Sequence, residues 1–319
     1  MIKVRNLKKT FGPKVAVNGI SFTLEKGEVL GFLGPNGAGK STTMRMITGF
    51  IPPNEGEITV GNYNMLENPI PAKRLIGYLP ENAPSYTDMT VNGFLNFCAE
   101  VRGLSGTAKK KAVSRVVEMC FLENVIHQSV ETLSKGYKHR TCFAQSIIHD
   151  PEVLILDEPT DGLDPNQKHE VRTLIRNMGK TKAIVFSTHI LEEVEAVCSR
   201  AIIIDRGQIV ANGTPEELKL RSQNAGGVRV QFATAIPEGV AGKLHTIPGV
   251  ERATVQNDYV AVQAAKDARG KLGSAIYELA VRENWKISEL HTEEGRLDEV
   301  FRGITLPDTK AGQKEAAVS

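Results

Sequence analysis

The spacing of the hydrophobic positions changes along the chain. Up to about residue 59, short apolar stretches alternate with turn signals such as Phe11-Gly12-Pro13, and the run Val29–Leu33 predicts a buried strand that enters a glycine-rich loop. From Thr90 to His149, apolar residues recur at helical spacing instead. Strand-like runs then alternate with helical ones, at 153–156, 165–178, 183–187, 190–198 and 201–205. This order predicts an α/β fold with a mostly parallel sheet and a helical insertion at about 82–150.

A second domain is predicted after about residue 220, where the polar, glycine-containing stretch 222–227 reads as a linker. The elements predicted beyond it follow the order β-α-β-β-α-β, at 228–232, 237–245, 253–256, 260–263, 268–282 and 287–291. We therefore expect one domain at 1–220 and a small α+β domain at 227–306. Residues 307–319 are rich in Lys, Gln, Glu and Ala and are expected to be disordered.

The charge balance and the apolar runs of the chain exclude some kinds of binding partner. The chain has 39 Lys and Arg against 37 Asp and Glu, a net charge of +2, so no nucleic-acid partner is expected. No apolar run approaches the roughly 20 residues that span a bilayer, and the first residues do not resemble a secretory signal. A cytoplasmic location is expected, with any membrane role supplied by another polypeptide. The cysteines lack metal-ligand spacing and are interpreted as reduced packing residues: Cys98, Cys120, Cys142 and Cys198.

A phosphate-binding loop is predicted after the strand 29–33. Residues 34–41, GPNGAGKS, fit the pattern G-x-x-x-x-G-K-[ST] and precede a predicted helix, a context that disfavours a chance glycine-rich turn. Glycines let backbone N–H groups turn toward a phosphate, and the helix N-terminus adds partial positive charge. Lys40 would reach the β- and γ-phosphates of a nucleotide, and Ser41 would offer an oxygen to Mg²⁺. The predicted nucleotide contacts in this segment are Gly34, Pro35, Asn36, Gly37, Ala38, Gly39, Lys40, Ser41 and Thr42.

A pair of carboxylates ends the apolar run Val153–Leu156. A buried strand rarely ends in two acidic residues such as Asp157 and Glu158 unless a ligand at its end requires them. Without other motifs nearby, the alternative is that the two side chains are simply solvated at the end of the strand. Beside a phosphate loop, Asp157 is predicted to hold Mg²⁺, through water, and Glu158 to polarise the water that attacks the γ-phosphate.

With these motifs in place, residues 2–220 resemble the ATP-binding cassette (ABC) ATPase family. Leu133-Ser134-Lys135-Gly136-Tyr137 is similar to the family's signature, Asp161-Gly162-Leu163-Asp164 to its D-loop, and Ser187-Thr188-His189 to its switch histidine. The resemblance implies a P-loop NTPase cassette that uses ATP and Mg²⁺ and pairs head to tail, each ATP lying between one phosphate loop and the partner's signature. It implies a γ-phosphate sensor at His189, which alone would be read as a packing or surface residue. The further nucleotide contacts that it implies are Phe11, stacked on adenine, Ser134, Gly136 and Asp164.

The chain departs from the family pattern at three positions. Glu81 stands where many members have glutamine in the coupling loop, and a carboxylate remains a good ligand for Mg²⁺. Lys135 and Tyr137 replace glycine and glutamine in the signature, with opposing electrostatic effects at a helix start. The predicted catalytic residues are Glu158, His189 and Glu81. The predicted metal ligands are Ser41, Glu81 and Asp157.

The signature spelling and the C-terminal end both resemble the branch of the family that serves ABC-2-type exporters. Leu297–Phe301 is similar to the closing helix of the small extra domain in that branch, or is an amphipathic helix that covers its own sheet. We therefore expect an ATPase subunit that energises a separate transmembrane permease, at the cytoplasmic face of the membrane and paired with a second ATPase subunit. The alternative is a soluble ABC ATPase that acts on ribosomes or DNA, whereas the signature and His189 argue against a P-loop kinase or GTPase.

Overall fold

The computed structural model describes residues 1–81, 85–222, 225–265 and 267–305. It divides into two compact units, Met1–Thr214 and Pro215–Ser319. The predicted division at residue 220 thus falls a few residues inside the second unit, and the stretch predicted to be a disordered tail lies outside the described residues. Each unit has its own buried core.

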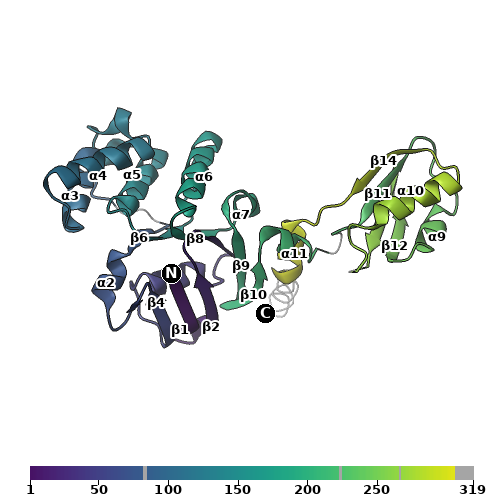
Figure 1. Ribbon diagram of the computed structural model, residues 1–319. Coiled ribbons are helices and arrows are strands. Elements are labelled where there is room, and N and C mark those ends of the chain that lie inside the picture. The colour runs from purple at the N-terminus through teal and green to yellow at the C-terminus, as the bar shows by residue number, and fades with distance from the viewer. Residues whose placement is uncertain (82–84, 223–224, 266, 306–319) are drawn as a thin grey trace, which may run out of the picture. The chain divides into compact units, whose positions relative to one another are not determined.

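A six-stranded sheet of order β10-β9-β3-β8-β7-β6 forms the centre of the first unit (Figure 1). Its strands are parallel apart from β10, which is antiparallel to β9. Every residue of β3, β7 and β8 is buried, as expected for uninterrupted apolar strands covered on both faces. This confirms the predicted α/β fold. The strands are β3 Val29–Leu33, β6 Ile76–Leu79, β7 Val153–Asp157, β8 Ala183–Thr188, β9 Arg200–Asp205 and β10 Gln208–Gly213.

An antiparallel sheet of order β2-β1-β4-β5 completes the core of this unit. One cluster of buried apolar side chains joins the two sheets, and α1 contacts both β2 and β7. The helix that follows the glycine-rich loop is therefore held between the sheets. These elements are β1 Ile2–Phe11, β2 Lys14–Leu24, α1 Lys40–Ile47, β4 Glu55–Val60, β5 Tyr63–Asn64 and the short helix α2 Pro69–Arg74.

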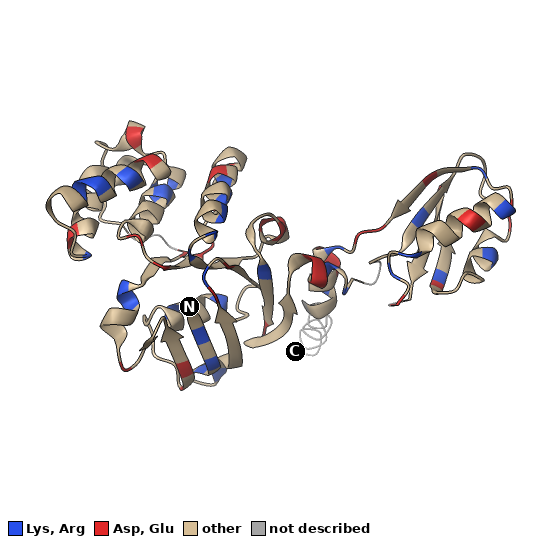
Figure 2. Cartoon of the chain, viewed as in Figure 1, with Lys and Arg blue, Asp and Glu red and all other residues tan. Residues whose placement is uncertain are grey.

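The predicted helical insertion is present as a separate group of helices (Figure 1). Two of them begin at a capping hydroxyl, because Thr90 Oγ1 accepts a hydrogen bond from Gly93 N and Ser134 Oγ accepts one from Tyr137 N. Lys and Arg recur along both α4 and α6 (Figure 2), and on α6 Arg172 and Arg176 donate hydrogen bonds to α7. The insertion contains α3 Val91–Val101, α4 Gly106–Met119, η1 Glu123–Val125, η2 Val130–Thr132 and α5 Lys135–Ile147. The helices α6 Pro165–Gly179 and α7 Leu191–Val197 come after it, where they connect strands of the six-stranded sheet.

The second unit contains the predicted β-α-β-β-α-β order, folded as an antiparallel sheet of order β12-β13-β11-β14. Its two central helices begin later than predicted. Gly239 and Gly270 have φ angles of 72° and 73°, a left-handed backbone that does not fit inside a right-handed helix. The elements are β11 Val228–Phe232, α9 Val240–His245, β12 Val250–Val255, β13 Tyr259–Ala264, α10 Leu272–Arg282 and β14 Ile287–Thr292.

The segment that gave two interpretations, 297–301, forms helix α11, Leu297–Thr305. It packs against the short helix α8, Pro215–Lys219, and buries Leu297 and Val300 while Leu218 of α8 is also buried. The segment is thus helical, and it packs mainly against α8. In the part of the chain that the structure describes, no helix combines the length and the apolar character needed to cross a membrane.

Candidate functional site

The glycine-rich loop joins β3 to α1, and its path requires glycine at two positions. A Cβ at Gly34 would lie 2.4 Å from the carbonyl oxygen of Ile204, and a Cβ at Gly39 would lie 2.5 Å from that of Ala16. Gly39 also has a φ of 108° and directly precedes α1. The unpaired N–H groups at the start of α1 are therefore presented at the loop, a geometry that suits an anion.

Lys40 is the first residue of α1 and is held back against the loop. Its Nζ donates hydrogen bonds to the carbonyl oxygens of Gly34, at 2.7 Å, and Pro35, at 3.3 Å. Burial lowers the pKa of the Lys40 ammonium, while the nearby carboxylates of Glu158, Asp157 and Glu81 act in the opposite direction. The site thus holds a cation whose carbonyl partners a phosphate could replace.

Asp157 ends β7 and is almost fully buried. Its Oδ1 accepts hydrogen bonds from Ser187 Oγ, at 2.5 Å, and from Ser41 Oγ, at 3.3 Å. The predicted metal ligands Ser41 and Asp157 therefore meet, although they lie far apart in the sequence. Both offer hard oxygen donors of the kind that Mg²⁺ prefers.

Glu158 follows Asp157 and has an unusual backbone, with a φ of 51°. Its N–H donates to the carbonyl oxygen of Ser187, at 3.2 Å, and to Ser187 Oγ, at 3.1 Å, which ties the turn to β8. Its Oε2 lies 2.9 Å from Nδ1 of His189. Burial raises the pKa of Glu158, and the neighbouring His189 and Lys40 oppose this shift. A carboxylate with a raised pKa beside a phosphate loop is suited to accept a proton.

A cavity of about 370 Å³ lies over the phosphate loop. Glu81 and Glu158 both reach it, and Phe11 stands at it half-exposed. Lys14 and Ala16 also line it, although they were not predicted. Phe11 pairs with Lys14 across the turn that joins β1 and β2, so the turn signal at Gly12-Pro13 could have placed Lys14 beside Phe11. The full lining is Phe11, Lys14, Ala16, Asn36, Gly37, Gly39, Lys40, Ser41, Thr42, Glu81 and Glu158.

The predicted signature and D-loop do not line this cavity but contact each other. Lys135 Nζ donates to Asp161 Oδ2 at 3.0 Å, and a Cβ at Gly136 would lie 2.5 Å from Oε1 of Gln167. Asp164 caps α6, because its Oδ1 accepts a hydrogen bond from Gln167 N at 2.9 Å. Ser134, Gly136 and Asp164 are thus brought together by the ends of α5 and α6, away from the phosphate loop's cavity.

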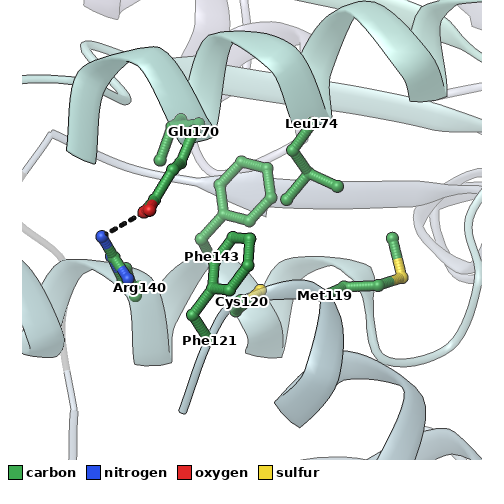
Figure 3. A pocket seen from close by; sticks show the side chains of 8 residues that line it. Met119, Cys120, Phe121, Arg140, Phe143, Glu170 and Leu174 are labelled. Carbon is green, nitrogen blue, oxygen red and sulfur yellow. Dashed lines mark hydrogen bonds and ion pairs between the residues drawn. The ribbon is translucent and has the colours of Figure 1, made fainter. Parts of the chain in front are cut away.

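The two helices that carry these segments are also fixed to each other farther along. Arg140 of α5 forms a 2.6 Å ion pair with Glu170 of α6 (Figure 3). The Arg140 guanidinium also lies 5.7 Å from the ring centroid of Phe121, which follows α4. The Arg140 side chain is 10% exposed and that of Glu170 is 40% exposed, so a partly buried ion pair joins the helical insertion to α6.

Comparison with known proteins identifies the family of this chain. A family model described as "ABC transporter" matches residues 17–161. The linearmycin resistance ATP-binding protein LnrL of Bacillus subtilis (strain 168) is 33% identical over 307 residues, which cover 96% of this chain and 98% of LnrL. The chain belongs to the ABC transporter ATP-binding protein family.

Other members of the ABC family match about two thirds of this chain. The Nod factor export ATP-binding protein I of Burkholderia lata is 38% identical over 218 residues, which cover 68% of this chain and 72% of that protein. A solved ATP-binding subunit of an ABC transporter superimposes with a TM-score of 0.64 at 28% identity, over 69% of this chain and 92% of the other. The first unit is therefore an ABC cassette that binds ATP, and the protein is an ATPase.

Proposed function

We propose that this ABC cassette protein powers a separate transmembrane permease of the ABC-2 exporter type, working as one of a pair of cassettes at the cytoplasmic face of the membrane. One observation in particular supports the proposed pairing of two cassettes. The cavity over the phosphate loop contains Lys40 and Glu158 but not Ser134 or Gly136 of the signature. An ATP held by Lys40 would present its γ-phosphate at the open side of the cavity, where the Ser134 helix start of a second cassette could bind it.

The chemistry proposed at this site is the transfer of the γ-phosphoryl group to water. Lys40 would exchange its carbonyl partners for phosphate oxygens, and Phe11 would stack on the adenine base. Glu158 would accept the proton of the attacking water, which its raised pKa favours. His189, 2.9 Å from Glu158, would orient that carboxylate and contact the γ-phosphate.

Mg²⁺ fits the donor set of this site. Ser41 and Asp157 bring two oxygen donors together, and Glu81 lines the same cavity. No group of three His, Cys, Asp or Glu side chains within the described residues could hold a metal ion. Nucleotide phosphates would therefore have to complete the ligand set, as is usual for Mg²⁺ in ATP sites. When bound, Mg²⁺ would neutralise charge on the phosphates during the transfer.

A permease would dock on α2 and α3, where apolar side chains remain exposed. Ile70 of α2 is 67% exposed and Val101 of α3 is 69% exposed. The two helices are adjacent, since Arg102 Nη1 donates to the carbonyl oxygen of Lys73 at 3.2 Å. Tyr86, 57% exposed, packs edge-on to Phe97 of α3 on the chain that follows Glu81. Exposed apolar groups on adjacent helices provide a surface through which hydrolysis could move a partner.

The export direction is proposed from the relatives. LnrL is named for linearmycin resistance, and the Burkholderia protein for Nod factor export. The match to LnrL spans both units of this chain, including the β-α-β-β-α-β domain. We propose that this protein likewise drives the removal of a compound from the cell.

The test is a capture experiment with full-length, tagged Glu158→Gln protein, incubated with ATP and detergent-solubilised membranes. We expect a multi-span membrane protein to co-purify. Ile70→Asp and Val101→Asp, each added to Glu158→Gln, should reduce the recovery of this membrane protein, because each places a charge on the proposed docking surface. Both side chains are exposed, so their replacement leaves the core intact. Recovery of ribosomal or DNA-associated proteins without a membrane protein would overturn the proposal in favour of a soluble ABC ATPase.

A further inference from the structure

A buried carboxylate lies next to the site but is not part of the cavity. Glu193, on α7, has no exposed surface. Its Oε1 accepts hydrogen bonds from Thr160 Oγ1, at 2.5 Å, and Arg172 Nη2, at 3.0 Å, and its Oε2 accepts one from Thr188 Oγ1, at 2.8 Å. Both carboxylate oxygens are therefore paired, and the Arg172 guanidinium balances the buried charge.

The two hydroxyls belong to the two turns that carry the reacting side chains. Thr160 lies two residues after Glu158, on the chain that leaves β7. Thr188 is the last residue of β8 and directly precedes His189. One carboxylate thus joins the turn of Glu158 to the turn of His189, on neighbouring parallel strands.

The backbone at Glu158 gives a reason for such a restraint. A non-glycine residue with a φ of 51° is in a sparsely populated conformation, which persists only where its surroundings fix it. Ser187 fixes the N–H of Glu158 from one side. The Thr160–Glu193 hydrogen bond fixes the chain that follows, so the backbone at Glu158 is restrained on both sides.

We propose that Glu193 is a positioning residue for ATP hydrolysis: by binding the hydroxyls of Thr160 and Thr188, it holds the Glu158 carboxylate against His189 in line with the attacking water. The inference rests on the proposed roles of Glu158 and His189. Glu193 itself does not line the nucleotide cavity, so it acts on the rate of the chemical step and not on ATP binding.

The test uses Thr160→Val, which has nearly the same shape and removes the hydroxyl while Arg172 still balances Glu193. Hydrolysis, equilibrium binding of a fluorescent ATP analogue and thermal unfolding are measured on the full chain. We expect kcat to fall on the order of 10- to 100-fold with ATP affinity little changed, because misplacing a catalytic group costs rate and not binding. Thr160→Ser, which restores a hydroxyl, should recover most of kcat.

Thr141→Val is the matched control. Thr141 is equally buried, but its hydroxyl donates to Tyr137 O within α5. This variant should keep its kcat even if its unfolding temperature falls. Equal losses of kcat in Thr141→Val and Thr160→Val, or no recovery in Thr160→Ser, would overturn the positioning role.

Glu193→Gln provides a second variant, which keeps the shape but removes the charge. It should lower kcat without weakening ATP binding, and Thr160→Val carries the test if Glu193→Gln does not fold. Glu158→Gln is measured in parallel to separate the two proposals. If Glu158→Gln is inactive while a folded Thr160→Val hydrolyses at the parent rate, only the role of Glu193 is lost. If Glu158→Gln hydrolyses at the parent rate, the role of Glu158 as base is lost, and that of Glu193 with it.

Discussion

Nδ1 of His189 lies 2.9 Å from Oε2 of Glu158, although the two residues follow different strands and are about thirty positions apart in the sequence. The contact exists because β7 and β8 are parallel neighbours whose carboxyl ends meet at one edge of the sheet. The His189 side chain is half-exposed whereas that of Glu158 is largely buried. The histidine is therefore the more accessible member of the pair.

Glu158→Gln should nearly stop ATP hydrolysis while leaving ATP binding intact. The amide keeps the size of the side chain but cannot accept the proton of the attacking water, so kcat should fall by about 10²-fold or more. Steady-state hydrolysis, together with size-exclusion chromatography in ATP, tests this: the variant should accumulate as an ATP-bound dimer. Hydrolysis at the parent rate would remove Glu158 from the base role.

The same substitution should change how stability depends on pH. Burial raises the pKa of Glu158 above that of the unfolded chain, so the folded state holds the proton to higher pH. Stability is then lost as the pH rises from the unfolded pKa, near 4.5, through the folded pKa. Glu158→Gln should unfold at the parent's temperature at low pH and at a higher temperature near neutrality. A lower unfolding temperature than the parent near neutrality would contradict this sign.

Lys40→Met should abolish useful ATP affinity. The variant retains the length of the stem but loses a cation whose hydrogen bonds to phosphates are each worth about 1.5–3 kcal/mol, so binding should weaken by about 100-fold or more. Isothermal titration calorimetry measures this directly, with thermal unfolding as the check that the fold is intact. Near-normal binding by a folded variant would show that the glycine-rich loop is not the phosphate site.

The ion pair between Lys135 and Asp161 should add little to stability. Their side chains are 70% and 55% exposed, and exposed pairs contribute about 0–1 kcal/mol. A double-mutant cycle with Lys135→Ala and Asp161→Ala, followed by urea unfolding at low and high salt, should give a small coupling that salt reduces. A coupling well above 1 kcal/mol would mean that the signature and D-loop form one rigid structural element.

The ATPase unit should fold without the second unit. We propose that residues 1–214 form an independent cassette that binds ATP, since the compact units meet between Thr214 and Pro215. A fragment that ends at residue 220 retains α8 but lacks α11, which covers it, so Leu218 becomes exposed. The fragment 1–214 should therefore unfold at a higher temperature than the fragment 1–220. Aggregation of the fragment 1–214 would contradict the proposed boundary.

Much of the site was predictable because its motifs are local. The strand, glycine-rich loop and helix that place Lys40 are contiguous in the sequence, and the cap at Ser134 follows from a hydroxyl before a helical stretch. Phe11 and Glu81 were predicted from resemblance and both reach the cavity. The predicted boundaries of helices failed mainly where a glycine adopts a left-handed backbone, as at Gly270.

Other features could not be predicted, because they depend on packing between distant segments. In the sequence, Glu193 looks like any acidic residue near the start of an amphipathic helix, and only the fold brings Thr160 and Arg172 to it. The positive φ of Glu158 carries no local signal either, since the residue is neither glycine nor asparagine. The strand order of the sheet is likewise set by which helices cross over it, and not by any single strand.

β8 is hydrogen-bonded to β3 on one side and to β7 on the other. The strand that leads to His189 is thus the spacer between the strand that leads to Lys40 and the strand that leads to Glu158. Fully buried central strands are the last parts of a protein to open. We therefore expect the sheet that positions these residues to stay rigid, and any movement that ATP hydrolysis causes to occur in the helices and loops around it.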